Sequence, residues 1–224
     1  FCLSGETPNS VDGLFEIVSG FTTRGASILS DVEALSRCNL YWRSFSHWLG
    51  GMGILVFLLA VVPEARKSAG SGMYLMRAES PGPSVGKLTP HLRQTALILY
   101  GLYMLLTVLC IGFLLLGGMP LFDSLCIAFG TAGTGGFAIR NSGMADYSAY
   151  LQNVVTVFMF LFGVNFSLYY LLLLRQFKSV FKNEELRLYA GIAVGAIVLI
   201  TIDISRMYGS VREALHHAAF QVSS

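Results

Sequence analysis

The feature that most constrains the fold is a run of 25 residues, Thr95 to Met119, that contains no charged side chain. A helix rises by about 1.5 Å per residue, so a helix of this length covers the roughly 30 Å hydrocarbon core of a bilayer. Two further segments, Tyr147 to Leu174 and Leu188 to Ile202, are also apolar and uncharged. Because 54% of the residues are hydrophobic and only 12% are charged, we predict an all-α polytopic membrane protein.

A fourth membrane-length segment, Tyr41 to Pro63, opens with side chains typical of a membrane interface, namely Trp42, Arg43, His47 and Trp48. It then contains three closely spaced glycines, at positions 50, 51 and 53. Glycines lower helix propensity but let neighbouring backbones approach closely. Close helix packing and a hinge are both open interpretations of this segment.

Two short Thr/Gly segments interrupt this pattern of long apolar runs. The first, Phe21 to Ser27, follows a predicted helix from Asp12 to Phe21, and the second, Thr131 to Phe137, follows one from Leu121 to Gly130. Both predicted helices are too short to span a bilayer, and a membrane-length segment follows each loop. The repetition predicts two re-entrant units, each made of a pore helix and a loop.

Thr/Gly backbone is suited to an ion-selectivity filter. A cation leaves water only if other oxygens replace its hydration shell, and backbone carbonyls of such loops can do so. Irregular backbone is tolerated at membrane depth only where it lines a cavity or is buried in protein. The C-terminal end of the preceding helix carries partial negative charge, which favours a cation. We therefore predict a cation pore in which Gly25 and Gly135, 110 residues apart, occupy equivalent places.

The distribution of charge predicts the orientation in the membrane. The side that contains the polar stretches 64–93 and 175–187 has a net charge of +5, and the opposite side has −3. Because positive loops are usually cytoplasmic, both Thr/Gly segments are expected to face the extracytoplasmic side. The acidic charges there either concentrate cations or merely keep the outer loops solvated, and both interpretations stay open.

Five motifs, spread over nearly the whole chain, carry a family resemblance: residues 21–26 (FTTRGA), 42–53 (WRSFSHWLGGMG), 74–83 (YLMRAESPGP), 133–137 (GTGGF) and 220–224 (FQVSS). With them the chain resembles the Trk/Ktr/HKT superfamily of potassium transporters, and within it the bacterial Trk membrane subunit. The resemblance implies four consecutive membrane–pore–membrane repeats around one central pore, in a multi-pass protein of the bacterial cytoplasmic (inner) membrane.

On this resemblance, residues 1–66 hold the pore helix, filter and second membrane helix of repeat 1, and residues 67–182 hold the complete repeat 2. Residues 183–224 hold the first membrane helix of repeat 3 and its pore helix, which we expect from Val211 to Ser224. The chain begins without an initiator methionine and ends inside an apolar run. We therefore expect an internal fragment that lacks the third filter and repeat 4 and does not conduct alone.

The resemblance also implies the site residues. Gly25 and Gly135 match the family's selectivity glycines, and potassium would bind the backbone carbonyls of Thr22, Thr23, Arg24, Gly25, Ala132, Gly133, Thr134 and Gly135. A glycine in the first filter goes with potassium preference in this family. A sodium-permeable relative and a non-conducting membrane scaffold are the alternatives. No organic cofactor is expected in this chain.

Arg24 departs from the resemblance, since many relatives have threonine before the first filter glycine. An unpaired charge inside a membrane costs on the order of 3 kcal/mol or more. We therefore predict that Arg24 pairs with Glu16, Asp31 or Glu33.

Three polar side chains in apolar surroundings have two open interpretations each. Asn165 is either an interhelical hydrogen-bond donor or a pore-lining group. His216 and His217 are either packing or interfacial residues or titrating gates.

The partners implied by the resemblance are a second copy of the protein and a cytosolic, nucleotide-binding regulatory subunit (TrkA-like) docking on residues 64–93 and 175–187. The lipid bilayer surrounds the chain, and no nucleic acid partner is expected. We do not expect an enzyme. Residues 130–136 superficially resemble a phosphate-binding loop, but an apolar helix precedes them instead of a strand, and no Gly-Lys-Ser/Thr motif occurs.

Overall fold

The computed structural model describes residues 9–53, 92–205 and 210–223, and the regular secondary structure of these residues is helical. The helices are α1 (Ser10–Phe21), α2 (Arg37–Gly51), α5 (Leu92–Leu116), α6 (Leu121–Ala132), α7 (Ala149–Phe162), α8 (Phe166–Leu173), α9 (Phe177–Phe181), α10 (Glu184–Ile204) and α11 (Val211–Ser223). The predicted all-α membrane fold is confirmed. The polar stretch 64–93 lies almost entirely outside the described residues, as does the end of the segment predicted from Tyr41 to Pro63.

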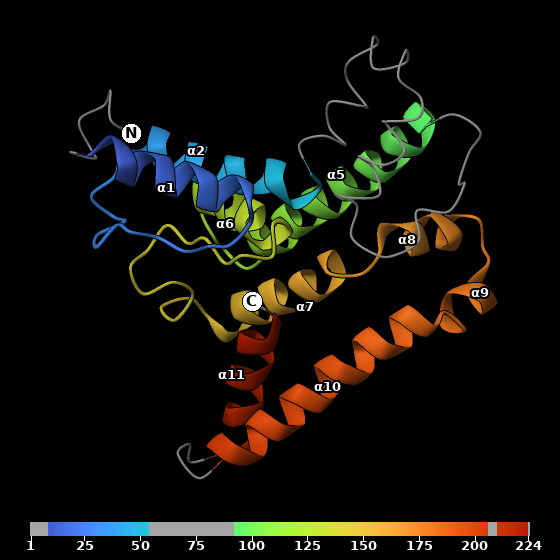
Figure 1. The fold of residues 1–224 in the computed structure, drawn as a ribbon. Coiled ribbons are helices and arrows are strands. Elements are labelled where there is room, and N and C mark those ends of the chain that lie inside the picture. The colour runs from blue at the N-terminus through green and yellow to red at the C-terminus, as the bar shows by residue number, and fades with distance from the viewer. Residues whose placement is uncertain (1–8, 54–91, 206–209, 224) are drawn as a thin grey trace.

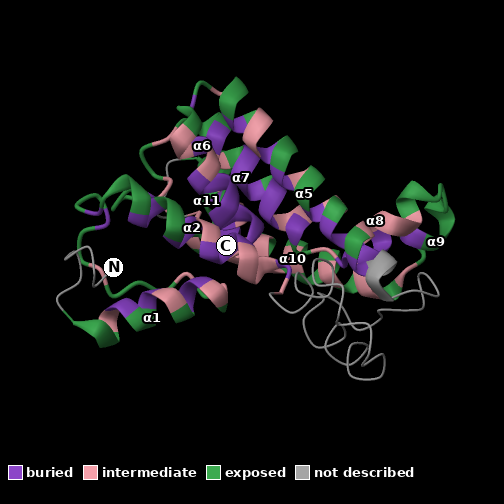
Figure 2. Cartoon of the chain, turned by 90° about the horizontal axis from the view of Figure 1, so that it is seen from above, coloured by how far each residue is buried: buried purple, intermediate pink, exposed green. Residues whose placement is uncertain are grey.

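The short helix α6 packs between α2 and α5, and α1 packs along the outer side of α2 (Figure 1). Figure 2 shows that buried residues are concentrated where α5, α6 and α7 lie side by side. An aromatic cluster fills this core, in which the Trp48 ring lies 5.4 Å from that of Tyr103 and 5.7 Å from that of Phe129. The short helix α6 is therefore an interior element, whereas α1 lies at the edge of the described structure with Val11, Leu14 and Val18 exposed.

Helices are present at both places where the sequence predicts a pore helix, and each is 12 residues long. The side chain of Asn9 caps α1 by accepting a hydrogen bond from the backbone N–H of Val11 at 3.1 Å, whereas α6 begins directly after Pro120. Their first residues are 111 positions apart, and so are their last. The structure therefore repeats a unit with a 111-residue register.

A helix, α11, is also present where the sequence predicts the third pore helix. It packs against α10 and α7, as α6 packs against α5 and α2 (Figure 1). Within the described residues, two helices are long and apolar enough to cross a bilayer, α5 over Ala96–Leu116 and α10 over its whole length, and the bent pair of α7 and α8 would be a third if it forms one span. α5 confirms the predicted span but begins three residues earlier, at Leu92.

The segment predicted as one span from Tyr147 to Leu174 is broken, and that prediction is wrong in its continuity. α7 and α8 meet at an angle of 88°. Gly163 caps the end of α7, and the side chain of Asn165 caps α8 by accepting a hydrogen bond from the N–H of Ser167 at 2.9 Å.

The break frees backbone carbonyls at the end of α7, and tyrosine hydroxyls bind two of them. Tyr169 donates to the carbonyl of Leu161 at 2.7 Å, and Tyr189 of α10 donates to the carbonyl of Phe160 at 3.2 Å. The amide of Asn165 donates to the carboxylate of Glu185 on α10 at 3.1 Å, which supports the interhelical interpretation of this residue.

Candidate functional site

The two Thr/Gly segments meet backbone to backbone at the C-terminal ends of α1 and α6. A Cβ atom at Gly25 would overlap the carbonyl oxygen of Gly135. A Cβ atom at Gly135 would lie 2.6 Å from the carbonyl oxygen of Thr23. Two loops 110 residues apart in the sequence thus place the carbonyl oxygens of Thr23 and Gly135 at one junction. A side chain larger than hydrogen at either glycine would push the two loops apart.

Both loops have the same unusual backbone conformation. Thr23 and Thr134 have φ values of 54° and 53°, and Gly25 and Gly136 follow with 68° and 71°. In the first loop Thr23 and Arg24 complete a Schellman cap, in which their N–H groups donate to the carbonyls of Gly20 and Ser19, both at 3.1 Å.

Glycine is the usual residue at the left-handed position of such a cap, and threonine is rarely found there. Strained residues of this kind cluster at functional sites. Sequence spacing pairs Gly25 with Gly135, whereas the 111-residue register and the φ values pair Gly25 with Gly136. Which carbonyls would face an ion therefore stays a prediction.

His47 of α2 lies directly behind the second loop. Its ring is fully buried and packs edge-on against Phe137, with ring centroids 4.6 Å apart. A Cβ atom at Gly133 or at Gly135 would overlap this ring. Among the residues that the structure describes, neither ring nitrogen has a hydrogen-bond partner. The second loop can therefore pack against the His47 ring only because it has glycines at positions 133 and 135.

A buried ion pair links the segments that follow the two loops. The Arg43 Nε lies 3.0 Å from Glu16 Oε2, and the two residues are 4% and 1% exposed. Glu16 Oε1 accepts hydrogen bonds from the hydroxyl of Ser27 at 2.6 Å and from the N–H of Ile28 at 2.7 Å.

The guanidinium group of Arg43 also contacts the end of the second loop. It donates to the carbonyl of Ala138 at 3.0 Å and lies over the ring of Phe137, 3.8 Å from its centroid. One ion pair therefore contacts the chain just beyond both Thr/Gly segments.

The predicted pairing of Arg24 with Glu16, Asp31 or Glu33 is wrong. Arg24 is exposed beyond the cap of α1, and no acidic side chain within the described residues pairs with it. Glu16 lies on the opposite, buried face of α1 and pairs with Arg43 of α2.

Asp31 and Glu33 instead join the outer ends of the two loops. The Asn141 side-chain amide donates to Asp31 at 2.7 Å, and its backbone N–H donates to Glu33 at 3.1 Å. The hydrogen bond from Asn141 lowers the pKa of Asp31 below its ordinary value.

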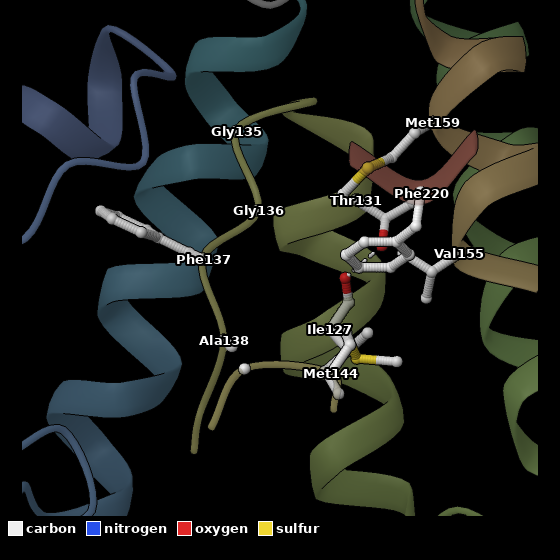
Figure 3. A pocket seen from close by; sticks show the side chains of 11 residues that line it. Ile127, Thr131, Gly135, Gly136, Phe137, Ala138, Met144, Val155, Met159 and Phe220 are labelled. Carbon is white, nitrogen blue, oxygen red and sulfur yellow. Dashed lines mark hydrogen bonds between the residues drawn. The ribbon is translucent and has the colours of Figure 1, made fainter. Parts of the chain in front are cut away.

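A pocket of about 200 Å³ lies on the far side of the second loop from α2, between α6, α7 and the end of α11 (Figure 3). Figure 3 shows Phe137 pointing away from this pocket, toward α2, while Met159 and Phe220 line it. The lining side chains are mainly apolar, and the hydroxyl of Thr131 is already used in a hydrogen bond to the Ile127 carbonyl at 2.7 Å. The pocket therefore offers packing space rather than a set of ligands.

His216 joins α11 to the chain around the second loop. Its Nε2 lies 2.6 Å from Gln152 Oε1, and the Gln152 amide donates to the carbonyls of Met144 and Tyr147, both at 3.0 Å. Because those donor bonds fix the orientation of the Gln152 amide, His216 Nε2 carries the proton and donates. His216 thus contacts residues of α7 through hydrogen bonds.

Among the eight predicted filter residues, the structure brings Thr23 and Gly25 into contact with Gly135, and Gly133 and Gly135 into contact with His47. Thr22 is the exposed C-cap of α1, and Ala132 is the buried last residue of α6.

Sequence reasoning missed the supporting roles of Arg43 and His47, which it assigned to the membrane interface. Both are buried, together with Trp48. Their spacing of four residues on one helix face was the available signal.

Known proteins are similar to this chain in sequence and in fold. A family model described as TrkH, a cation transport protein, matches residues 2–204. The Trk system potassium uptake protein TrkH of Salmonella typhimurium is 34% identical over 226 residues, covering 98% of this chain and 46% of the relative. The Trk system potassium uptake protein TrkG of Escherichia coli is 38% identical over 197 residues, covering 87% of this chain and 40% of the relative.

A solved structure is also similar. The crystal structure of the potassium transporter TrkH from Vibrio parahaemolyticus superimposes with a TM-score of 0.76 at 27% identity, over 96% of this chain and 43% of that one. This chain thus spans less than half the length of these relatives.

Proposed function

The chain belongs to the TrkH family of cation transport proteins, and from that premise we propose that it is part of a potassium uptake protein of the bacterial inner membrane. The family is one of transporters rather than of enzymes. The observation that carries the proposal is the meeting of two Thr/Gly loops at the ends of two equivalent short helices. A cation enters a membrane where carbonyl oxygens replace its water, and this junction gathers such oxygens.

In the proposed mechanism, potassium sheds its water among backbone carbonyls of residues 22–25 and 132–135 and passes inward down its electrochemical gradient. The C-terminal ends of α1 and α6 add partial negative charge on the path of the ion. The described loops would supply two of four filter segments. Supporting this proposal, the conformation of the first loop is repeated in the second to within a few degrees in φ at two positions.

The repeat boundaries are part of the proposal. Residues 1–66 would belong to repeat 1, residues 67–182 to repeat 2, and residues 183–224 to repeat 3. The common 111-residue register of α1 and α6 supports the first two units. The packing of α11 against α10 and α7 supports a third unit related to them.

We further propose that the whole protein works as a dimer with a cytosolic, nucleotide-binding regulatory subunit. The names of the relatives place those proteins in a Trk system, which favours an assembly of several components. The basic residues of the stretch 175–187, namely Arg175, Lys178, Lys182 and Arg187, form the described part of the expected docking surface. The other expected part, 64–93, lies almost entirely outside the described residues.

The test is growth of a potassium-uptake-deficient bacterium on low potassium, with the full-length parent supplied alone and together with a regulatory subunit. The proposal predicts rescue of growth and accumulation of potassium in preference to sodium. Accumulation of sodium without potassium, and without rescue of growth, would favour the sodium-permeable alternative. Absence of ion uptake, despite expression in the membrane, would favour a non-conducting scaffold.

A further inference from the structure

The ion pair between Glu16 and Arg43 is almost completely shielded from solvent. Removing two charges from water costs free energy that their mutual attraction does not always recover, so a buried pair is weak evidence for stability. A pair of apolar residues could hold α1 against α2 at least as well. We therefore look for a role of Glu16 and Arg43 that apolar residues could not perform.

The remaining hydrogen bonds of the pair suggest that role. Glu16 uses its second oxygen to hold Ser27 and Ile28, two and three residues beyond Gly25. Arg43 uses a second nitrogen to hold the carbonyl of Ala138, three residues beyond Gly135. Hydrogen bonds to charged groups are shorter and stronger than those between neutral groups. The pair thus forms one continuous link from the first loop to the second.

The second structural unit does not repeat this link at the corresponding positions. In the 111-residue register, the positions that correspond to Glu16 and Arg43 are Ile127 and Val154. Neither of these side chains can carry charge or donate a hydrogen bond. The second loop therefore has no ion pair of its own at these positions, and the segment that follows it is bound at Ala138 by Arg43 of the preceding unit.

We propose that Glu16 and Arg43 are positioning residues for ion selection. They fix the chain after the first loop, at Ser27 and Ile28, relative to the chain after the second loop, at Ala138. This sets the spacing of the carbonyl oxygens at the junction of Thr23 and Gly135. This inference rests on the proposed function. A filter discriminates between cations through the number and placement of its oxygens, so loosening the link lowers discrimination before it abolishes transport.

The test compares potassium and sodium uptake by the full-length parent in proteoliposomes, for the wild type, Glu16→Gln, Arg43→Lys and the double variant. Glu16→Gln keeps an acceptor for Ser27 but loses the charge, and Arg43→Lys keeps the charge but cannot reach two acceptors as a fork. Each single variant is expected to lose about tenfold in potassium preference, which corresponds to roughly 1.4 kcal/mol. The double variant should lose little more, because both changes break the same link.

Two controls remove a charge from the same helices away from the link. Asp12→Asn lies in the first turn of α1, and Arg37→Gln is an exposed change at the start of α2. Both should keep the wild-type preference. If neither link variant reaches the membrane, Ser27→Ala decides, because it removes one hydrogen bond to Glu16, leaves the ion pair, and should shift the preference slightly in the same direction.

The outcomes separate this inference from the proposed function. A wild type that takes up no potassium even with the regulatory subunit supplied would refute the proposed function. A wild type that selects potassium, beside link variants or Ser27→Ala with unchanged preference, would overturn the inference alone. Strictly additive losses in the double variant would also overturn it, because the two residues would then act independently.

Discussion

Replacing Gly133 by alanine tests the fit between the second loop and His47. Gly133 has φ −76° and ψ −6°, an ordinary right-handed conformation, so alanine brings no backbone strain. Its methyl group would, however, overlap the ring of His47 and lie 2.9 Å from the His47 carbonyl oxygen. The ring has little room to move, because it packs against Phe137 on α2's side of the loop.

Inserting a methyl group into a well-packed interior costs about 1–3 kcal/mol, and a fully buried ring as the obstacle places this variant near the upper end. For a chain of 150–250 residues, each kcal/mol lowers the melting temperature by roughly 2–4 °C. The shift per kcal/mol is smaller in a longer protein, so we expect Gly133→Ala to lower the melting temperature of the full-length parent by only a few degrees. His47→Ala is destabilising by itself, by about 2–5 kcal/mol, because it leaves a cavity. Once the ring is gone, adding Gly133→Ala should cost little more.

The assay is thermal unfolding of the purified full-length parent in detergent for the wild type, both single variants and the double variant. Gly101→Ala is the matched control, since Gly101 is exposed on α5 with nothing within 4 Å of an added Cβ atom. That control should be neutral or stabilising by up to about 1 kcal/mol. The steric argument fails if Gly133→Ala is as stable as the wild type. It fails equally if the alanine costs as much without the His47 ring as with it.

Two further predictions concern groups around the site. Because the pKa of Asp31 is lowered, its contact with Asn141 stabilises the folded protein above the ordinary pKa of 3.8, and this stabilisation is lost as the pH falls through the lowered value. Asn141→Ala should therefore be less stable than the wild type at neutral pH, and the difference in unfolding free energy between the two should shrink below about pH 4. A difference that does not change with pH would contradict this. Tyr169→Phe removes the donor to the Leu161 carbonyl at the end of α7 and should cost about 1 kcal/mol in thermal unfolding. Tyr170→Phe is its control, and an equal effect of the two changes would show that the hydrogen bond contributes nothing.

Much of the fold could be predicted from hydrophobic patterning. α5 contains an uncharged run of membrane length that begins at Thr95, and α1 and α6 are mainly apolar helices, too short to span, that end at Thr/Gly segments. Such patterns are local, so the sequence reports them directly.

The break between α7 and α8 was not predicted, because the residues around it remain uncharged and apolar. Its local signal was nevertheless present. Gly163 and Asn165, two residues apart, have the side chains expected at the end of one helix and the start of the next.

The supports of the site depend on tertiary structure and could not be predicted in the same way. Arg43 contacts the carbonyl of Ala138, 95 residues further along the chain, and no local pattern links the two. The same holds for the partner of Glu16. Glu16 pairs with Arg43 and not with Arg24, which is nearer in the sequence, because its side chain lies on the face of α1 that packs against α2. Sequence spacing also aligned the two loops at 110 residues, whereas the helix ends and φ values repeat at 111.

The most direct test of the central claim is the potassium-to-sodium uptake ratio of the full-length parent in proteoliposomes for the wild type, Gly25→Ser and Gly118→Ser. Both glycines have positive φ, 68° and 81°, so both variants carry similar backbone strain. A side chain at position 25 would overlap the Gly135 carbonyl, whereas nothing lies within 4 Å of a Cβ atom at Gly118. If the two loops form one filter, Gly25→Ser loses potassium preference and Gly118→Ser keeps it. An unchanged ratio in Gly25→Ser, at wild-type levels in the membrane, would contradict the account.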